Sequence, residues 1–289
     1  MRIAVRGAGL AAVLLATGPA AAASVELKHI VAKVVILPES RPDVAVTVIK
    51  TNPRLPIRVR QPLGGVTVVD GGSDDWWPRL FGGRMSRCRV GPDAASVHVA
   101  GVGDFGDDEL PQILVRTPMN AKVSSSGAVV GSVPAADSLD LSVAGCDVWT
   151  IGDIKGRLRL DEAGQGRVRI GNLGSAEVNI AGTSTVTTKA IAGAYKVSIG
   201  GAADLYSTSA NGPIEVSIAG SGNVWVNGGH TSQLKGSIAG DGCLTYEGAA
   251  DRVAVSVAGK AKVHVAHVAG VNGPVDDTVR GLGEIRRGP

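Results

Sequence analysis

Apolar and polar positions alternate in short stretches through the second half of the chain, and a recurring glycine separates the stretches. The repeated phrase is Ser-Ile-Ala-Gly or a close variant, and its last glycine, here called the anchor, falls at positions 127, 145, 164, 182, 201, 220, 240 and 259. Positions two and four before an anchor are mostly apolar, as in Val178 and Ile180, and positions four and six after it repeat this pattern, as in Val224 and Val226. A period of two predicts β-strands. Each repeat is therefore expected to hold two short strands bent at the glycine, which accepts backbone angles that other residues avoid.

The spacing of the anchors, eighteen to twenty residues, predicts the architecture. Self-similarity at this period with β-branched residues is typical of an all-β parallel β-helix, or β-solenoid, with one repeat per coil. We expect about 19 residues per coil, at least eight coils and a right-handed coil. A leucine-rich repeat has a similar period, but its Leu-x-x-Leu-x-Leu frame is absent.

Charged residues five positions before the anchors alternate in sign from one repeat to the next. This charge row consists of Lys122, Asp140, Arg159, Glu177, Lys196, Glu215 and Lys235. In a parallel stack these side chains lie about 4.8 Å apart, where opposite charges attract. The row therefore predicts the register of the coils, with Lys196 between Glu177 and Glu215. Three positions before the anchors runs a polar row of Ser124, Ser142, Asp161, Asn179, Ser198, Ser217, Ser237 and Ser256.

The chain before the repeats carries strand patterns but no clear anchors. The patterns fall at residues 29–37, 44–49, 57–59, 66–69 and 113–116. We interpret residues 24–120 as irregular opening coils of the same solenoid with a loop insertion at about 71–112; a small separate β domain is the alternative. Regular repeats fill residues 121–270, and residues 271–289 are expected to form a polar C-terminal cap or a flexible tail.

The first 23 residues have the features of a secretory signal peptide. Arg2 and Arg6 precede an apolar run at 8–16, and small residues lead to a cleavage site near Ala23. The run is shorter than the roughly 20 residues that a membrane span requires, and no later segment qualifies. We therefore expect a protein that is exported to the periplasm or cell surface and does not span the membrane.

Charge composition argues against a nucleic-acid partner. The net charge of +3 falls by two when Arg2 and Arg6 leave with the signal peptide, and the remaining charges are mixed in sign. A nucleic-acid binder needs a basic stripe of one sign to displace counterions from phosphates.

The three cysteines suggest one disulfide and one free thiol in an oxidising compartment. Cys146 and Cys243 follow anchors five coils apart, which separates them by about 24 Å along the rod, whereas a disulfide needs Cα atoms within roughly 7 Å. Cys88 and Cys146 are the preferred pair, which would tie the insertion to an early coil.

Catalysis would need carboxylates grouped around one bond, as in a polysaccharide lyase or hydrolase. Glu177 and Glu215 are two coils apart with Lys196 between them, so the charge row explains them. The acids of the insertion could group more freely, although a solvated loop is the favoured interpretation. They are Asp104, Asp107, Asp108 and Glu109.

Metal binding and cofactors are not expected. A calcium β-roll needs a column of oxygen ligands, but the column three after the anchors contains Arg167 and Lys262. His264 and His267 could suggest a metal, but no third ligand is near in sequence, and a solvated pair is favoured.

A column of aromatic and polar residues five positions after the anchors is the most functional-looking feature. This aromatic row is read as Trp149 (after a one-residue deletion), Arg169, Thr187, Tyr206, Trp225, Thr245 and His264. Outward rings could contact sugar rings or a protein partner, or they could merely shield the strand backbone. Trp76 and Trp77 in the insertion could bind in the same way or be buried against the rod.

The phrase Ser-Ile-Ala-Gly-Ser-Gly-Asn-Val at 217–224, with near copies at 179–186 and 237–244, resembles the auto-transporter adhesin, head GIN domain family. The resemblance covers roughly residues 113–268. It implies an exported bacterial β-helix with an adhesin-like role and no established catalytic residues. Only the repeat at Gly220 keeps Gly-Ser-Gly intact, so a ligand that recognises this phrase would find one good site.

Three functions remain open from the sequence. The first is a non-enzymatic, adhesin-like envelope protein that binds a polysaccharide or another surface protein through its outward faces. The second is a carbohydrate-active β-helix enzyme with its site in the 71–112 insertion. The third is a purely structural envelope protein.

Overall fold

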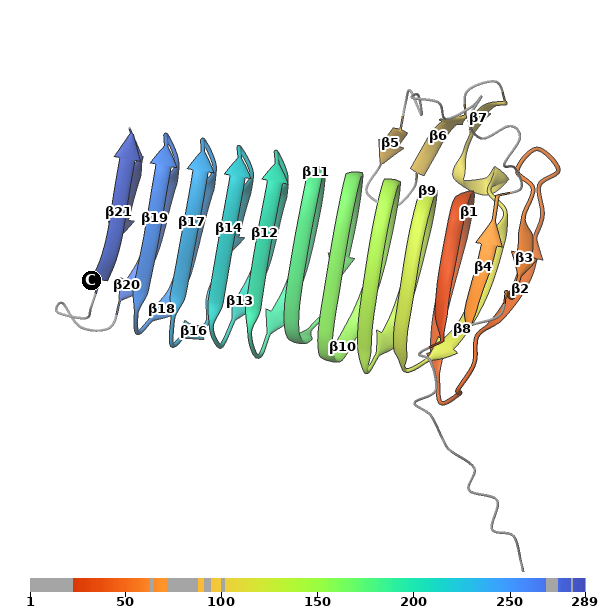
Figure 1. Cartoon of the computed structure of the whole chain (residues 1–289), viewed down its shortest axis with the longest axis horizontal. Coiled ribbons are helices and arrows are strands. Elements are labelled where there is room, and N and C mark those ends of the chain that lie inside the picture. The colour runs from red at the N-terminus through yellow and green to blue at the C-terminus, as the bar shows by residue number, and fades with distance from the viewer. Residues whose placement is uncertain are drawn as a thin grey trace, which may run out of the picture.

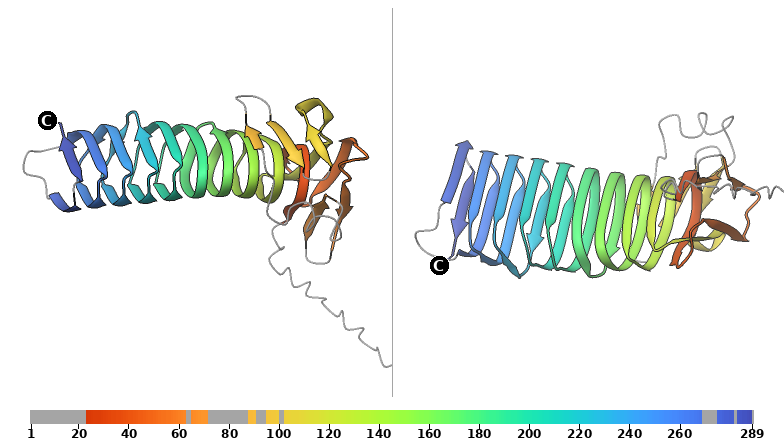
Figure 2. Two further views of the ribbon diagram at one scale, coloured as in Figure 1. Left: turned by 90° about the horizontal axis from the view of Figure 1, so that it is seen from above. Right: turned by 60° about the horizontal axis from the view of Figure 1, so that its bottom comes forward.

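The chain forms a straight rod of stacked β coils with a small module at its N-terminal end (Figure 1). The computed structural model describes residues 23–62, 65–71, 88–90, 95–99, 102–268, 275–281 and 283–288. Seen from above and from below, the rod keeps one cross-section along its length, and the module lies to one side (Figure 2).

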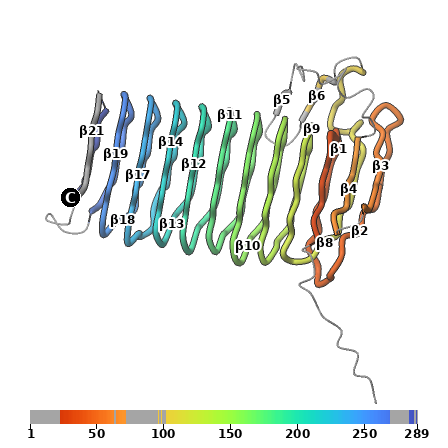
Figure 3. Tube along the Cα trace, in the orientation of Figure 1, coloured from red at the N-terminus to blue at the C-terminus, as the bar shows by residue number. Residues whose placement is uncertain are grey.

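Each coil pairs in parallel with the next, in a register of about nineteen residues. The strands of the regular coils are β9 (Asn120–Ala136), β10 (Ser138–Ile170), β11 (Leu173–Ile191), β12 (Tyr195–Gly201), β13 (Asp204–Ala210), β14 (Ile214–Gly220), β15 (Asn223–Val226), β16 (His230–Thr231), β17 (Leu234–Gly240), β18 (Cys243–Ala250), β19 (Val253–Gly259) and β20 (Lys262–Val268). Ser198 pairs with Ser217, Ser217 with Ser237 and Ser237 with Ser256. The predicted β-solenoid of about 19 residues per coil is confirmed, and the coils stay evenly spaced in the trace of Figure 3.

The anchor glycines form a column at one corner of the rod. All eight have positive φ, from +113° at Gly259 to +140° at Gly182, a region that side chains other than glycine's rarely enter. A Cβ atom at Gly201 would lie 2.5 Å from the carbonyl oxygen of Gly182, and each later anchor meets the anchor before it in the same way. The repeat therefore requires glycine both for the corner angle and for close stacking of coils.

Inward side chains of successive coils form one apolar core, which is mostly aliphatic and includes the rings of Trp149, Tyr195 and Tyr246. It runs from Val25 and Leu27 in the first strand to Val263 and Val265 in β20. The strands contribute alternate residues, as their period of two requires. Each coil therefore depends on its neighbours for the burial of its inward side chains.

The N-terminal end starts as a coil and then departs from the parallel pattern. β1 (Ser24–Glu39) pairs in parallel with β9, β4 (Val66–Asp70) and β8 (Gln112–Pro118). β2 (Ala45–Lys50) and β3 (Arg58–Arg60) instead pair antiparallel with β8 and β4. β1 therefore stacks in parallel with its neighbours, whereas β2 and β3 are antiparallel additions to the first coils.

The insertion carries a three-stranded antiparallel sheet of its own. Its strands are β5 (Cys88–Val90), β6 (Ala95–Val99) and β7 (Gly103–Phe105), and the 3-10 turn η1 (Asp107–Glu109) follows. A second apolar cluster joins this insertion module to the outside of the rod; it contains Val31, Leu55, Phe105, Leu110, Ala128 and Cys146. Ala128 and Cys146 directly follow anchors, so the module covers the corner of the first coils.

The C-terminal segment extends the solenoid instead of forming the predicted polar cap or tail. β21 (Val275–Gly281) pairs with β19, and β22 (Glu284–Arg287) pairs with β20. Gly259 pairs with Gly281, which places a further glycine at the anchor position. The spacing between these two glycines is longer than that of the other repeats, and this longer spacing concealed the last coil in the sequence.

Candidate functional site

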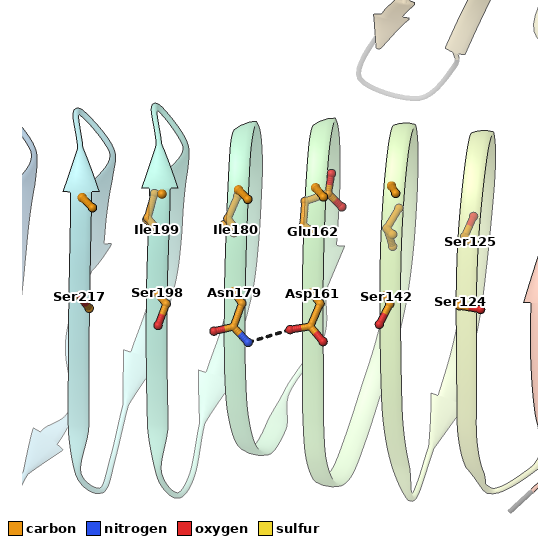
Figure 4. A pocket seen from close by; sticks show the side chains of 16 residues that line it. Ser124, Ser125, Ser142, Asp161, Glu162, Asn179, Ile180, Ser198, Ile199 and Ser217 are labelled. Atoms are coloured by element: carbon orange, nitrogen blue, oxygen red, sulfur yellow. Dashed lines mark hydrogen bonds between the residues drawn. The ribbon is translucent and has the colours of Figure 1, made fainter. Parts of the chain in front are cut away.

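A shallow trough runs along one outer face of the rod, just before the glycine corner. It has a volume of about 660 Å³ and crosses six successive coils. One side is the polar row, here Ser124, Ser142, Asp161, Asn179, Ser198 and Ser217. The floor is a row of small residues, Ala144, Ala163, Ala181, Gly200 and Ala219. Figure 4 shows the polar side chains in line across neighbouring strands.

The Ser-x-Ala-Gly phrase produces the outer trough directly. Alanine and serine lie one and three positions before the anchor, so both point outward on the same strand. Because alanine extends only one carbon from the backbone, the floor is low and apolar, and the hydroxyls stand beside it. Small residues and short polar residues recur at these positions from coil to coil, so the trough is straight and its polar side chains repeat at about 4.8 Å.

The trough is charged only at its centre. Asn179 Nδ2 donates a hydrogen bond to Asp161 Oδ1 at 2.7 Å (Figure 4), and Arg159 Nε donates to Asp161 Oδ2 at 2.9 Å. Partial burial would raise the pKa of Asp161, but these hydrogen bonds outweigh it and hold that pKa below its usual range. Asp161 is therefore an anion at neutral pH whose charge is compensated by Arg159.

The charge row borders the polar row, and the strand register confirms its order. Lys122 pairs with Asp140, Arg159 with Glu177, Glu177 with Lys196, Lys196 with Glu215, and Glu215 with Lys235. Glu177 forms ion pairs with Arg157 and Arg159, and the hydrogen bond from Arg157 lowers the pKa of Glu177. Because the signs alternate, the face beside the trough has no strong net charge.

The aromatic row presents ring edges rather than open ring faces. Tyr206 and Trp225 stack on each other with ring centroids 4.5 Å apart and planes 2° from parallel. They are partners in the register of β13 and β15, so the stack runs along the rod axis. One face of each ring is thus used by the other ring, which leaves little flat aromatic surface for a sugar to cover.

Trp149 does not belong to the aromatic row, and its predicted outward position is wrong. The register pairs Trp149 with Gly131 four residues after the anchors, without a deletion, and the side chain is fully buried. A Cβ atom at Gly131 would overlap the Trp149 ring. Because Gly131 has no side chain, the ring of Trp149 on the next coil has room beside it.

The remaining predicted residues do not assemble a catalytic centre in the described part of the chain. Asp107 forms an ion pair with Lys33, Asp104 contacts His98, and Glu109 accepts the Gly106 N–H at 3.0 Å. These acids thus contact different groups instead of converging. Trp76 and Trp77 lie outside the described residues.

The cysteines agree in part with the predicted pairing. Cys146 is disulfide-bonded and Cys243 is free. The side chain of Cys88 lies outside what the structure describes, so its pairing with Cys146 stays a prediction.

No cluster of three or more His, Cys, Asp or Glu side chains suited to a metal ion occurs among the described residues. His264 Nε2 lies 3.6 Å from Glu247 Oε1 on the outer surface. His267 is exposed on the same strand, β20.

Comparison of the chain with protein-family models, curated proteins and solved structures finds no match. Within the part that the structure describes, no helix is long and apolar enough to span a membrane.

Two buried acids, Asp147 and Glu162, were missed in the sequence although a signal was present. Asp147 lies two positions after the anchor Gly145 and Glu162 two positions before Gly164, both at inward positions of the repeat. Most coils carry an aliphatic or small residue there. An acid in an inward column is therefore the signal that could have identified them.

Proposed function

We propose that this protein is an exported, non-enzymatic β-solenoid that binds an extended, neutral polysaccharide along the outer trough. The observation that carries the proposal is the trough itself, in which an apolar floor is flanked over six coils by regularly spaced polar side chains, four serine hydroxyls with Asp161 and Asn179 between them. Sugar rings present apolar C–H surfaces and hydroxyl edges, which match the floor and the polar row. The signal peptide and the resemblance to the head GIN domain family support an adhesin-like role in the cell envelope.

A polysaccharide fits the trough better than a protein partner. Protein interfaces depend on aromatic and arginine anchors in pockets, whereas the floor here consists of alanine and glycine. A peptide could add as a strand only at a sheet edge, but the strands of the trough already pair on both sides.

Charge favours a neutral polymer over an anionic one. A polyanion needs a surface of one positive sign, and the charge row alternates in sign along the whole trough. The Asp161 carboxylate at the centre, whose charge Arg159 compensates, can accept hydrogen bonds from sugar hydroxyls.

Filling the trough should abolish binding. Ala181→Trp places an indole on the floor at the centre of the trough, because Ala181 is exposed and lines it. We expect the amount retained on insoluble neutral glucan or chitin to fall at least tenfold, measured by depletion from solution. Ala239→Trp is the matched control, because Ala239 is exposed in the same small row but beyond the trough.

Equal retention of both variants and the wild type would contradict the proposal. So would stronger binding to alginate, an anionic polymer, or release of reducing ends from any polymer in the panel. Sedimentation could also show that the wild type self-associates. If Ala181→Trp removes this self-association and Ala239→Trp does not, the trough binds a second copy of the chain instead.

Removing the stacked rings should leave polysaccharide binding unchanged. Trp225→Ala deletes one ring of the Tyr206–Trp225 stack, which offers ring edges and lies on a different face from the trough. The affinity for the glucan is expected to stay within about twofold in isothermal titration. A tenfold loss of affinity would show that the aromatic row takes part in binding.

A further inference from the structure

Two carboxyl groups lie inside the mostly apolar core, close to the glycine corner. Asp147 has no exposed surface and Glu162 is 2% exposed. Both belong to β10, on successive passages of the chain around the rod. An ionised side chain at such a depth is costly unless a partner compensates its charge.

Hydrogen bonds satisfy only half of each carboxyl group. Asp147 Oδ1 accepts the N–H of Val129 at 3.1 Å, and Glu162 Oε1 accepts the hydroxyl of Ser184 at 3.0 Å. The other two oxygens, Asp147 Oδ2 and Glu162 Oε2, are buried and have no hydrogen-bond partner among the described residues.

Gly166 provides the space in which Glu162 faces Asp147. A Cβ atom at Gly166 would lie 2.6 Å from Glu162 Oε1 and 3.1 Å from the backbone oxygen of Asp147. Gly166 pairs with Ser184 on the next coil. The Glu162 carboxyl therefore occupies the position of the missing side chain, between the coil of Asp147 and the coil of Ser184.

The strands packed around the pair supply no compensating charge in the described structure. β9 contributes Val129 opposite Asp147, and β11 contributes Ile180 opposite Glu162 and the neutral Ser184. On β10, the charged neighbours Asp161 and Arg167 are partly exposed on the outer side. Burial raises the pKa of Glu162 to about 7, and burial together with the nearby Glu162 raises the pKa of Asp147 well above its usual range.

We propose that Asp147 and Glu162 form a proton-dependent latch, which holds protons and a closed corner up to neutral pH and loosens when the protons are lost. Loss of the protons places uncompensated negative charge in the core. Cys146, on which the insertion module packs, precedes Asp147, and Asp161 at the centre of the trough precedes Glu162. The latch therefore links the solvent pH to the packing of the insertion module and to the centre of the trough.

The direction of the pH effect follows from the protons bound in each state. Unfolded carboxyls ionise near pH 4, whereas folded Glu162 keeps its proton up to about pH 7. Between these values the folded state binds more protons, so stability falls as the pH rises. In this pH range, each proton that the folded state holds and the unfolded state has lost makes the unfolding equilibrium constant rise tenfold per pH unit.

Urea unfolding between pH 5 and pH 8 tests the latch. We expect the unfolding constant of the wild type to rise at least tenfold per pH unit up to about pH 7, relative to the double variant Asp147→Asn, Glu162→Gln. Glu215→Gln, which changes an exposed acid of the charge row, should keep the wild-type slope. Equal slopes in the wild type and the double variant would overturn the proposal. Stabilisation of the wild type by Ca²⁺ or Na⁺ at pH 8, reversed when the cation is removed, would show that a cation, not a proton, holds the pair.

A second measurement needs no variant. In the wild type, infrared difference spectra should show a protonated carboxyl signal at pH 6 that disappears by pH 9. If no protonated carboxyl is present at pH 6, the latch does not exist.

Discussion

Gly201→Ala should lower the free energy of unfolding by about 3 kcal/mol, because the new side chain meets two separate obstacles. The residue has φ of +134°, where an L side chain is strained. Its Cβ atom would also lie 2.5 Å from the carbonyl oxygen of Gly182, which is itself part of the anchor column and cannot move without shifting a neighbouring coil. The measurement is the midpoint of urea unfolding followed by circular dichroism.

The adjacent Gly200→Ala is the matched control. Its Cβ atom would meet nothing closer than the Ile180 carbonyl oxygen at 3.9 Å, and the equivalent position of most other coils already holds alanine. We expect no loss of stability, or a gain of about 0.5 kcal/mol from the less flexible unfolded chain. Similar losses in both variants would show that the anchor column does not determine the corner.

The coils and their register were predictable because a solenoid stacks the same contact many times. Any single glycine or charged residue fits several alignments, but eight anchors, seven of which have a charge of alternating sign five positions before them, permit one alignment. The pairing of Lys196 with both Glu177 and Glu215 shows that this alignment is correct. The outer trough follows from the same phrase, although its depth depends on how successive strands are placed in space.

Features that occur once in the chain were not predictable in the same way. The outward prediction for Trp149 assumes a one-residue deletion, whereas the register contains none and places the ring in the inward column. It fits here because Gly131 lies beside it in the stack. The Glu162 carboxyl likewise uses the space beside Gly166, which has no side chain. Each of these arrangements depends on one particular pair of residues, and the average of the repeats does not show such a pair.

The last coil was missed for a related reason. The segment after residue 270 is polar, and its glycine falls outside the regular spacing. Pairing of β21 with β19 nevertheless restores the register from Val253 to Gly259. A longer connection between strands leaves the stacked positions unchanged, so spacing alone was too strict a criterion.

The pair of Trp149 and Gly131 should show strong compensation in a double-mutant cycle. Trp149→Val removes a fully buried ring and should cost about 3 to 5 kcal/mol, as large-to-small core substitutions do. Gly131→Val alone should cost at least about 2 kcal/mol, because its Cβ atom would overlap the ring.

Combined, the two substitutions should cost less than Trp149→Val alone, since valine at position 131 fills the space that the ring leaves. The column would then resemble later coils, where Val168 and Val186 are paired in the same way. We expect an interaction energy of at least about 2 kcal/mol, which is within the range for residues in contact. Val168→Ala with Gly131→Val is the control cycle, because Val168 is not a partner of Gly131 in the register. Additive losses for Trp149 and Gly131 would mean that the ring and the glycine do not share one space in the core.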